Sequence, residues 1–338
     1  MAILTWTVVF TSGSTGTPKG VVTTHQNFAS AATHQQDILH IRSSSRVFDF
    51  VSYNFDVSWS NHLQTLICGG CLCIPSETER RNDIPGAFNR MKCDYVYFTP
   101  SVARSLDPSS MPGIKYLAMG GEPIQRSEVV RWTQAEAIIG IYGPAECAQA
   151  LSFVRLDSNC HNNHVGHPFG ANMWLVKPGC PDRLAAIGAI GELLIEGPTV
   201  SQGYFADADK TTAAYIKDPP WLLQGTSTHP GRSGTLYKTG DLLRYNSDGT
   251  FDFIGRKDGM IKLRGQRIEL AEVEYHVRVC LEDASLYDGI AAEIIRPQKS
   301  NPLLAVFISL ADSQSQIPSA FSELIESLEQ KLIDRLPQ

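Results

Sequence analysis

The sequence predicts an α/β fold: a doubly wound, mostly parallel sheet, then a β-rich portion and an incomplete, small α+β C-terminal portion. Three observations predict it. Short apolar runs alternate with amphipathic stretches up to about residue 141, the pattern becomes strand-rich after about residue 151, and a new α+β pattern begins beyond residue 258. We expect a large subdomain at residues 1–257 and a smaller one at residues 258–338.

The first portion begins with a β-branched, apolar run at residues 5–10, which predicts a buried strand. Further strands are predicted at residues 46–51, 71–74, 95–98, 116–119 and 138–141, and helices at 26–39, 57–68, 84–91, 101–106 and 125–133. Ligands of such sheets bind beyond the carboxyl ends of the strands. Polar segments follow predicted strands at residues 11–20, 54–60, 120–122 and 142–146.

The β-rich portion has predicted strands at residues 172–176, 193–196, 236–245 and 251–254, with a Gly/Pro/Ser-punctuated surface loop at 224–234. The last portion has predicted helices at residues 270–279 and 319–336 and strands at 289–295 and 303–310. We find no internal repeat.

Composition narrows the function classes. Apolar residues make up 43% and charged residues 19%, as in a globular chain. The net charge of −6 gives no basic field for nucleic acid or an anionic membrane, and no apolar run approaches the roughly 18 residues of a membrane span. The N-terminus lacks the features of a signal peptide, so we expect a cytoplasmic protein.

Two groups of side chains have metal-ligand chemistry. Cys68 and Cys71 form a CxxC pair with no second pair at zinc spacing, and a turn into a strand is the favoured interpretation. His161, His164 and His167 recur in a polar stretch, where a solvated loop is favoured over a metal site.

The segment of residues 11–20 predicts polyphosphate binding. Glycines there let the backbone approach an anion, hydroxyls and N–H groups donate to phosphate oxygens, and Lys19 adds positive charge. It is not the common NTPase loop, because Thr17-Pro18 stand where a Gly-Lys pair is needed. A Ser/Gly surface turn is the structural alternative.

With its preceding strand, this segment resembles the nucleotide loop of adenylate-forming (AMP-dependent synthetase and ligase) enzymes, most closely adenylation domains of nonribosomal peptide synthetases. The resemblance implies ATP and Mg²⁺ as cofactors. It assigns ATP binding to the loop residues Thr11, Ser12, Gly13, Ser14, Thr15, Gly16 and Lys19.

Residues 142–146 (Tyr-Gly-Pro-Ala-Glu) follow a predicted strand. A tyrosine can stack on a purine, and a carboxylate can hold Mg²⁺ beside phosphates. A structural turn is the equal alternative. In the resembled family Tyr142 packs on adenine and Glu146 binds the metal. Nucleotide contacts carried over from the family also include Gly121, Glu122 and Gly143.

Residues 237–241 (Tyr-Lys-Thr-Gly-Asp) are similar to the family segment whose aspartate, here Asp241, holds both ribose hydroxyls. A carboxylate suits this task because it accepts two hydrogen bonds. Residues 255–258 match the segment that ends the large subdomain, with Arg256 on ribose or phosphate and Asp258 at the hinge. The catalytic set implied by the resemblance is Lys19, Glu146 and Arg256.

Asp56 distinguishes branches of the family. A buried carboxylate pairs with an α-ammonium group, since an unpaired buried charge is costly; a helix cap is the structural alternative. Amino-acid-activating members have an aspartate at this position. By the same carry-over, the side-chain pocket consists of Val57, Ser60, Tyr97, Ala118, Gly120, Ile141, Gln149 and Ala150.

The resemblance therefore implies amino-acid activation for loading onto phosphopantetheine of a carrier (thiolation) domain, with a condensation domain in the parent synthetase. Family members are longer at both ends, so we expect a truncated chain whose activity alone is doubtful. The alternatives are an acyl-CoA or aryl-acid ligase of the same superfamily, which Asp56 disfavours, and a non-catalytic remnant that binds nucleotide.

Overall fold

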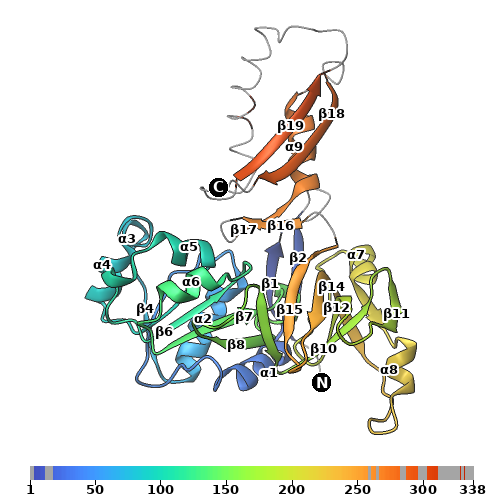
Figure 1. Ribbon diagram of the computed structural model, residues 1–338, viewed down its shortest axis with the longest axis horizontal. Helices are drawn as coiled ribbons and strands as arrows, with labels where there is room; N and C mark the ends of the chain where they lie inside the picture. The colour runs from blue at the N-terminus through green and yellow to red at the C-terminus, as the bar shows by residue number, and fades with distance from the viewer. Residues whose placement is uncertain are drawn as a thin grey trace. The chain divides into compact units, whose positions relative to one another are not determined.

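The computed structural model describes residues 4–11, 18–257, 260–263, 266–281, 287–295 and 303–310, together with residues 328 and 331. It divides into two compact units, Met1–Phe10 with Gly20–Lys257, and Thr11–Lys19 with Asp258–Gln338. Figure 1 shows how the elements are arranged, with most of them labelled.

Five parallel strands form the α/β part of the first unit, in the order β4-β3-β5-β6-β7. They are β3 (Arg46–Phe48), β4 (Cys71–Cys73), β5 (Tyr95–Phe98), β6 (Tyr116–Gly120) and β7 (Ala137–Tyr142). All five were predicted, and β5 has the predicted bounds. The connecting helices are α1 (His25–Gln35), α2 (Asp56–Ile67), α3 (Glu77–Asn82), α4 (Ile84–Arg90), α5 (Pro100–Ser105) and α6 (Arg126–Arg131), with a 3₁₀ turn η1 (Pro108–Ser110).

Helices cover both faces of these strands, as a doubly wound sheet requires. Alternate residues of a strand point to opposite faces. On one face Phe98 and Met119 pack with Phe88 of α4 and Trp132 after α6. On the other face lies a second cluster, in which strand residues pack with α2. The α/β prediction is confirmed.

The same sheet continues into the β-rich part through antiparallel strands. Among the described residues this one sheet has 13 strands. Its order from β7 is β8-β9-β15-β14-β12-β10-β11, with β13 paired to β14. The strands are β8 (Ser152–Leu156), β9 (His164–Pro168), β10 (Asn172–Lys177), β11 (Cys180–Leu184), β12 (Ile190–Glu196), β13 (Tyr215–Lys217), β14 (Thr235–Tyr245) and β15 (Phe251–Arg256), with helices α7 (Ala208–Ala214) and α8 (Pro220–Gln224).

Two sequence interpretations are wrong. The first strand, β1 (Thr5–Thr11), pairs with β2 (Lys19–Thr24) in a separate two-stranded sheet and is not buried, since Phe10 is 61% exposed. His164 and His167 do not lie in a solvated loop but on β9. In both cases strand pairing determines the outcome: β1 pairs with β2, and β9 pairs with β8 and β15.

The second unit contains the hairpins β16 (Met260–Leu263) with β17 (Gln266–Glu269) and β18 (Tyr287–Ile295) with β19 (Leu303–Leu310), and helix α9 (Leu270–Leu281). Val273 and Val277 lie one helical turn apart on α9 and pack with Ile290 and Ala292 of β18. The predicted helix at residues 319–336 falls outside the described residues, except for positions 328 and 331, which are helical.

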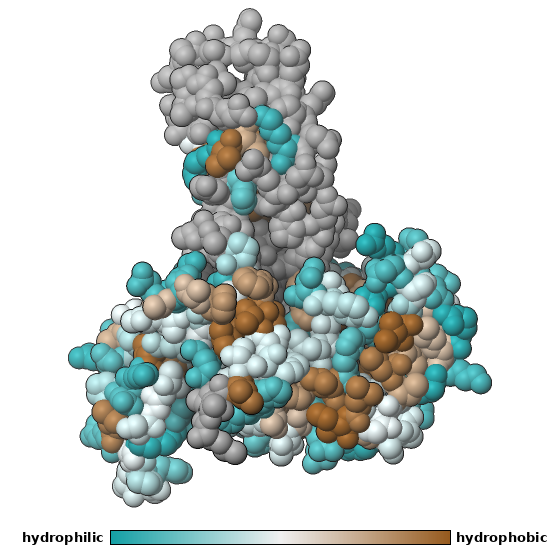
Figure 2. Space-filling model, turned by 180° about the vertical axis from the view of Figure 1, so that it is seen from behind, coloured by the Kyte–Doolittle hydropathy of each residue, from teal (hydrophilic) through white to brown (hydrophobic). Residues whose placement is uncertain are grey.

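No helix among the described residues is long and apolar enough to cross a bilayer. Large apolar side chains are nonetheless exposed in places, including Ile187 (88%) and Phe205 (62%). Figure 2 shows that on one face such side chains gather in separate patches divided by hydrophilic residues.

Candidate functional site

Three side chains that the sequence assigned to nucleotide binding meet at one place in the first unit. Asp241 of β14 and Arg256 of β15 are cross-strand partners, and Arg256 Nη1 lies 2.5 Å from Asp241 Oδ1. Tyr142, at the end of β7, donates its hydroxyl to the other oxygen, Asp241 Oδ2. Arg256 Nη1 also donates to the carbonyl of Thr239 at 3.0 Å. The side chains of Asp241 and Arg256 are 10% and 13% exposed.

This arrangement keeps Tyr142 a hydrogen-bond donor. Burial raises the pKa of Tyr142 well above its ordinary value, and the neighbouring carboxylate of Asp241 raises it further. Asp241 is fixed from its backbone, because its N–H donates to Thr239 Oγ1 at 2.9 Å while that hydroxyl donates to the carbonyl of Leu193 at 3.0 Å. An ionised carboxylate offers about four acceptor positions, and Tyr142 and Arg256 use two of them. Two acceptor positions on Asp241 therefore remain for a pair of adjacent hydroxyl groups on a ligand.

A tight turn after Tyr142 places the remaining residues of that motif. Gly143 packs so closely on the next segment that a Cβ there would lie 1.7 Å from the carbonyl oxygen of Gln149. Ala148 and Gln149 both have positive φ, 54° and 80°, an uncommon conformation for non-glycine residues that clusters at functional sites. The turn includes the 3₁₀ segment η2 (Ala145–Cys147). Glycine at position 143 is therefore required by packing.

Glu146, the predicted metal ligand, is fully buried at 0% exposure. Its Oε1 accepts a hydrogen bond from the hydroxyl of Tyr204 at 2.9 Å, and its carbonyl accepts from the N–H of Ser201 at 2.8 Å. The segment holding Tyr204 is itself bound to β2: the N–H of Phe205 donates to the carbonyl of Gly20 at 2.7 Å. Glu146 is thus connected, through Tyr204, to the strand that follows the phosphate-loop sequence.

Tyr204 is a residue that sequence reasoning missed. It comes from an irregular segment before α7, without periodicity or a glycine-rich signature to single it out. Its ring packs against that of Tyr215, with centroids 5.9 Å apart. Only the tertiary structure identifies it as a partner of Glu146.

Residues predicted to line the substrate pocket form one cluster on the α2 face of the sheet. Four of them are buried and pack together, with Val57 of α2 partly buried against them: Tyr97, Ala118, Ile141 and Ala150. Ser60, also on α2, is 2% exposed. Gly120 lies directly against the same cluster. A Cβ at that position would lie 2.3 Å from the Tyr97 hydroxyl and 2.4 Å from the Ile141 carbonyl.

Asp56 begins α2, and its Oδ1 accepts the N–H of Val57 at 3.0 Å. The residue before the helix, Phe55, makes no side-chain cap. Burial raises the pKa of the Tyr97 phenol, and the charge of Asp56 is the next largest cause, so the two groups interact electrostatically. The carboxylate lies in the first turn of α2, at the positive end of the helix dipole. Gln149 is 6% exposed, and its Oε1 has no hydrogen-bond partner within the described part of the chain.

A buried charge network supports the loop that leads to Asp56, and the sequence did not reveal it. Asp49 is 0% exposed after β3, and its Oδ2 lies 3.0 Å from His62 Nε2 of α2 and 3.6 Å from Arg80 Nη2 of α3. Tyr53, in the loop itself, donates to the same oxygen at 3.0 Å, and the Arg80 guanidinium lies 5.0 Å from the Tyr53 ring centroid. Three elements are thereby held around one carboxylate.

The other predicted residues are spread over several elements. Gly121 has a positive φ of 82°, and Glu122 Oε2 accepts from the Ser101 N–H (3.0 Å) and hydroxyl (2.6 Å) at the start of α5. Thr11 ends β1 and Lys19 begins β2. The remaining predictions lie outside the described residues: Ser12, Gly13, Ser14, Thr15, Gly16 and the hinge Asp258.

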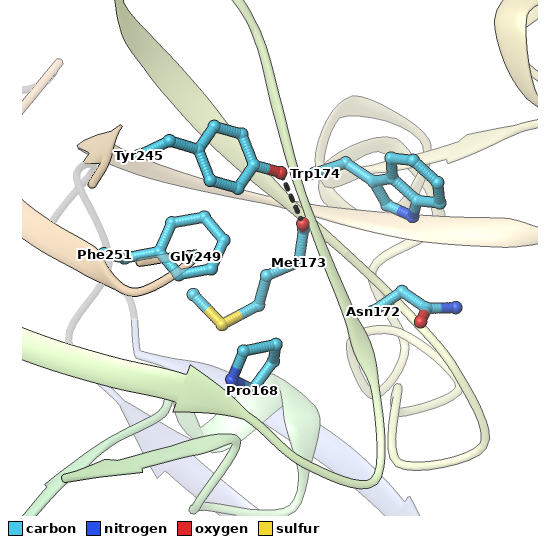
Figure 3. Close-up of a pocket in the computed structure, with 7 residues that line it drawn as sticks. All are labelled: Pro168, Asn172, Met173, Trp174, Tyr245, Gly249 and Phe251. Atoms are coloured by element: carbon cyan, nitrogen blue, oxygen red, sulfur yellow. Dashed lines mark hydrogen bonds between the residues drawn. The ribbon is translucent and has the colours of Figure 1, made fainter. Parts of the chain in front are cut away.

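A pocket of about 230 Å³ lies elsewhere, in the β-rich part, and contains none of the predicted site residues. Figure 3 shows the side chains of Tyr245, Phe251, Met173 and Pro168 converging there, with the Tyr245 hydroxyl donating to the Met173 carbonyl at 3.1 Å. Because it contains none of the predicted site residues, we do not assign the chemistry to it.

Comparison with known sequences agrees with the motifs. A family model described as "AMP-binding enzyme" matches residues 5–205. The chain is 44% identical over 336 residues to "Nonribosomal peptide synthetase ungA'" of Aspergillus campestris (strain IBT 28561), and 43% identical over 336 residues to "Peramine synthetase A" of Epichloe festucae (strain Fl1). The alignments cover 98% and 97% of this chain but 4% and 12% of those relatives, so the chain spans a small part of their length.

Solved structures agree on the fold. The chain is similar to the Vibrio cholerae adenylation domain AlmE, solved in complex with glycyl-adenosine-5'-phosphate, with a TM-score of 0.79 and 22% identity over 97% of this chain and 60% of that one. It is also similar to holo-PA1221, "an NRPS protein containing adenylation and PCP domains", with a TM-score of 0.75 and 24% identity over 93% of this chain and 53% of that one.

Proposed function

Because the chain belongs to the family of AMP-binding enzymes, we propose that it activates an amino acid by adenylation, converting ATP and the amino acid into aminoacyl-AMP and pyrophosphate. The observation that carries the proposal is the meeting of Tyr142, Asp241 and Arg256. Residues from three separate strands form one hydrogen-bonded group, which supports the nucleotide-binding roles proposed for them.

At the nucleotide, the two acceptor positions that remain on Asp241 suit the two neighbouring hydroxyls of a ribose. The Tyr142 ring supplies a flat face for adenine. Arg256, whose charge is permanent, lies beside them and neutralises phosphate charge. Lys19 and the hydroxyls of the phosphate loop hold the departing pyrophosphate. Transfer of the adenylyl group from ATP to the amino acid is accelerated mainly by positioning and charge neutralisation.

Mg²⁺ bound to ATP would neutralise charge on the phosphates, and the chain's own donor chemistry suits it. Proteins hold this ion through one or two carboxylates completed by phosphate oxygens and water, and Glu146 supplies a carboxylate in the motif directly after Tyr142. Tyr204 holds Oε1 of that carboxylate, which orients the group. We assign Glu146 to the metal and Tyr204 to its orientation.

At the substrate, Asp56 would receive the α-ammonium group, and the cluster around Tyr97 and Ala118 would enclose the side chain. Glycine at position 120 leaves room that a Cβ would fill. An ion pair at this partly enclosed position favours substrates that carry the amine. The glycyl-adenosine-5'-phosphate held by AlmE agrees with an amino-acid substrate.

We further propose that the aminoacyl group passes to the phosphopantetheine thiol of a carrier domain, with a condensation domain in the same parent synthetase. Relatives named as nonribosomal peptide synthetases and the adenylation–PCP protein PA1221 support this setting. We propose Asp258 as the hinge between the subdomains at residues 1–257 and 258–338, which the change of compact unit after Lys257 supports. A cytoplasmic location and the absence of nucleic-acid and membrane partners stay predictions.

The test is ATP–pyrophosphate exchange with a panel of amino acids, each paired with the same acid lacking its amine. We expect exchange that depends on the amine. Preference for the amine-free acids would instead identify an acyl-CoA or aryl-acid ligase. Saturable ATP binding without exchange for any acid would indicate a nucleotide-binding chain without turnover.

A further inference from the structure

Two histidines and an aspartate converge in the β-rich part of the first unit, away from the residues assigned to adenylation. Asp252 of β15 is the register partner of His164 on β9, and His161 precedes β9 in the same polar segment. His161 Nε2 lies 2.6 Å and His164 Nδ1 lies 3.4 Å from the same oxygen, Asp252 Oδ1. The two imidazole ring centroids are 4.3 Å apart.

Hydrogen bonding alone does not account well for this group. Asn246 Nδ2 donates to Asp252 Oδ1 as well, at 2.9 Å, so three nitrogens point at one oxygen. A carboxylate oxygen has about two acceptor positions. One of the three nitrogens is therefore surplus unless something other than a proton lies between the imidazoles and the carboxylate.

A divalent cation bound between the imidazoles and the carboxylate would account for the three nitrogens around Asp252 Oδ1. It would take one lone pair from each imidazole and one from Asp252 Oδ1, leaving the second acceptor position of that oxygen to Asn246. We propose that His161, His164 and Asp252 form a binding site for Zn²⁺, a borderline cation that favours imidazole and carboxylate ligands. The three ligand atoms all lie within 4.8 Å of one another.

Two of the three ligand separations can be compared with zinc geometry. Zinc–ligand distances of about 2.0–2.2 Å in a tetrahedral arrangement separate neighbouring ligand atoms by roughly 3.4 Å. The His164–Asp252 distance of 3.4 Å already equals this value. The His161–Asp252 distance must widen, and the His161 side chain is free to shift because it is 56% exposed.

The surroundings of Asp252 resemble the outer ligand contacts that orient metal-binding carboxylates. Asn246 holds Oδ1, and Arg244, its cross-strand partner on β14, lies 3.4 Å from Oδ2. His164 and Asp252 have side chains that are 10% and 11% exposed, whereas that of His161 is 56% exposed. The exposed side leaves the fourth zinc position to water. Bound zinc would cross-link β9 and β15, which are already neighbouring strands of the sheet.

The test is titration of the full 338-residue chain with Zn²⁺ by calorimetry and with Co²⁺ by visible absorbance. We expect one saturable site, tetrahedral Co²⁺ bands, and affinity lowered roughly tenfold or more in His161→Ala. His167→Ala is the matched control, because this exposed histidine lies on β9 outside the cluster, and it should bind as the unmodified chain does.

Thermal unfolding gives an independent readout. A ligand that binds the native state raises the midpoint, so Zn²⁺ should raise it in the unmodified chain and in His167→Ala but not in His161→Ala. The exposed position of His161 keeps that variant folded. Absence of saturable binding would overturn the proposal. So would binding that survives His161→Ala and disappears in Cys71→Ser, since Cys71 is an exposed free thiol elsewhere.

Discussion

Tyr142 and Asp241 lie 99 residues apart in the chain, and the phenolic hydroxyl of the first donates to the carboxylate of the second. One residue ends the last parallel strand, and the other lies in an antiparallel strand of the β-rich part. The contact joins the two halves of the first unit at the proposed nucleotide site. It makes Asp241 the first residue to test.

Asp241→Asn preserves the size of the side chain but removes its charge, and an NH2 donor replaces one of the two acceptor oxygens that Tyr142, Arg256 and a ribose would share. We expect ATP affinity to fall roughly tenfold or more, since hydrogen bonds to charged groups contribute about 1.5–3 kcal/mol. Equilibrium ATP binding and the KM for ATP in the exchange assay measure it. Asp182→Asn, an exposed residue on β11, is the control. Equal affinities in the two variants would remove Asp241 from the site.

Asp56→Ala tests recognition of the amine. If Asp56 pairs with the substrate ammonium, the variant loses amino-acid-dependent exchange while ATP binding persists. The same acid without its amine should lose far less, because that substrate never used the ion pair. Asp37→Ala, at an exposed position, should behave as the unmodified chain. Equal losses for both substrates would assign Asp56 to the first turn of α2 alone.

Lys19→Ala tests the phosphate loop. Removing the cation should slow ATP–pyrophosphate exchange roughly tenfold or more, from the loss of one charge-assisted contact. Lys115→Ala, an exposed lysine in the first unit, is the matched control and should leave the rate unchanged. An unaltered exchange rate in Lys19→Ala would instead support the interpretation of residues 11–20 as a surface turn.

Gly143→Ala tests the turn that holds Gln149. The added Cβ would lie 1.7 Å from the Gln149 carbonyl oxygen, so the backbone must move, at a cost of roughly 1–3 kcal/mol in the free energy of unfolding. Gly255→Ala is the control, since no atom lies within 4 Å of a Cβ there. Urea denaturation of both variants measures the difference. Equal stabilities would contradict the close packing described for this turn.

Glu196→Gln tests a pH-dependent contribution to stability. Burial acts to raise the pKa of Glu196, but hydrogen bonds from Arg232 and Trp174 outweigh it, and the net pKa is lowered. Arg232 binds the carboxylate with two nitrogens, at 2.7 and 2.6 Å. A lowered folded-state pKa means that the stabilisation is complete above the unfolded-state pKa, about 4.3, and is lost as the pH falls through the folded value.

The unmodified chain should therefore have a higher free energy of unfolding than Glu196→Gln. This difference should be largest at pH 7 and should decrease as the pH falls below about 4.3. Urea denaturation at several pH values measures the difference. Glu136→Gln, at an exposed position, should show little difference at any pH. A difference that widens in acid would have the opposite sign to the contribution assigned here.

The parallel core was predictable because its strands are continuous apolar runs. Residues 95–98 form β5 with the predicted bounds, and residues 138–141 form the centre of β7. The predicted nucleotide residues Tyr142, Asp241 and Arg256 could be named from their motifs. Their mutual contacts could not be, because the pairing of β14 with β15 and the proximity of β7 are tertiary facts.

Several short elements escaped prediction for identifiable reasons. Helix α3 is polar throughout and depends on capping by Ser76, which accepts the N–H of Glu79, rather than on an apolar face. Strands β8 and β9 are bounded by charged and histidine-containing stretches, and β9 owes its place to pairing with β8 and β15. Local sequence carries little information about partners that lie more than 80 residues away.

The sheet of the first unit is continuous from β4 to β11, because β8 and β9 connect the parallel strands to the antiparallel ones through backbone hydrogen bonds. Amide protons in β7, β8 and β15 should therefore exchange with deuterium only when both halves open together. The two halves would then share one protection level rather than two. Ligand recognition at Tyr142 and Asp241 would draw on the rigidity of the entire sheet.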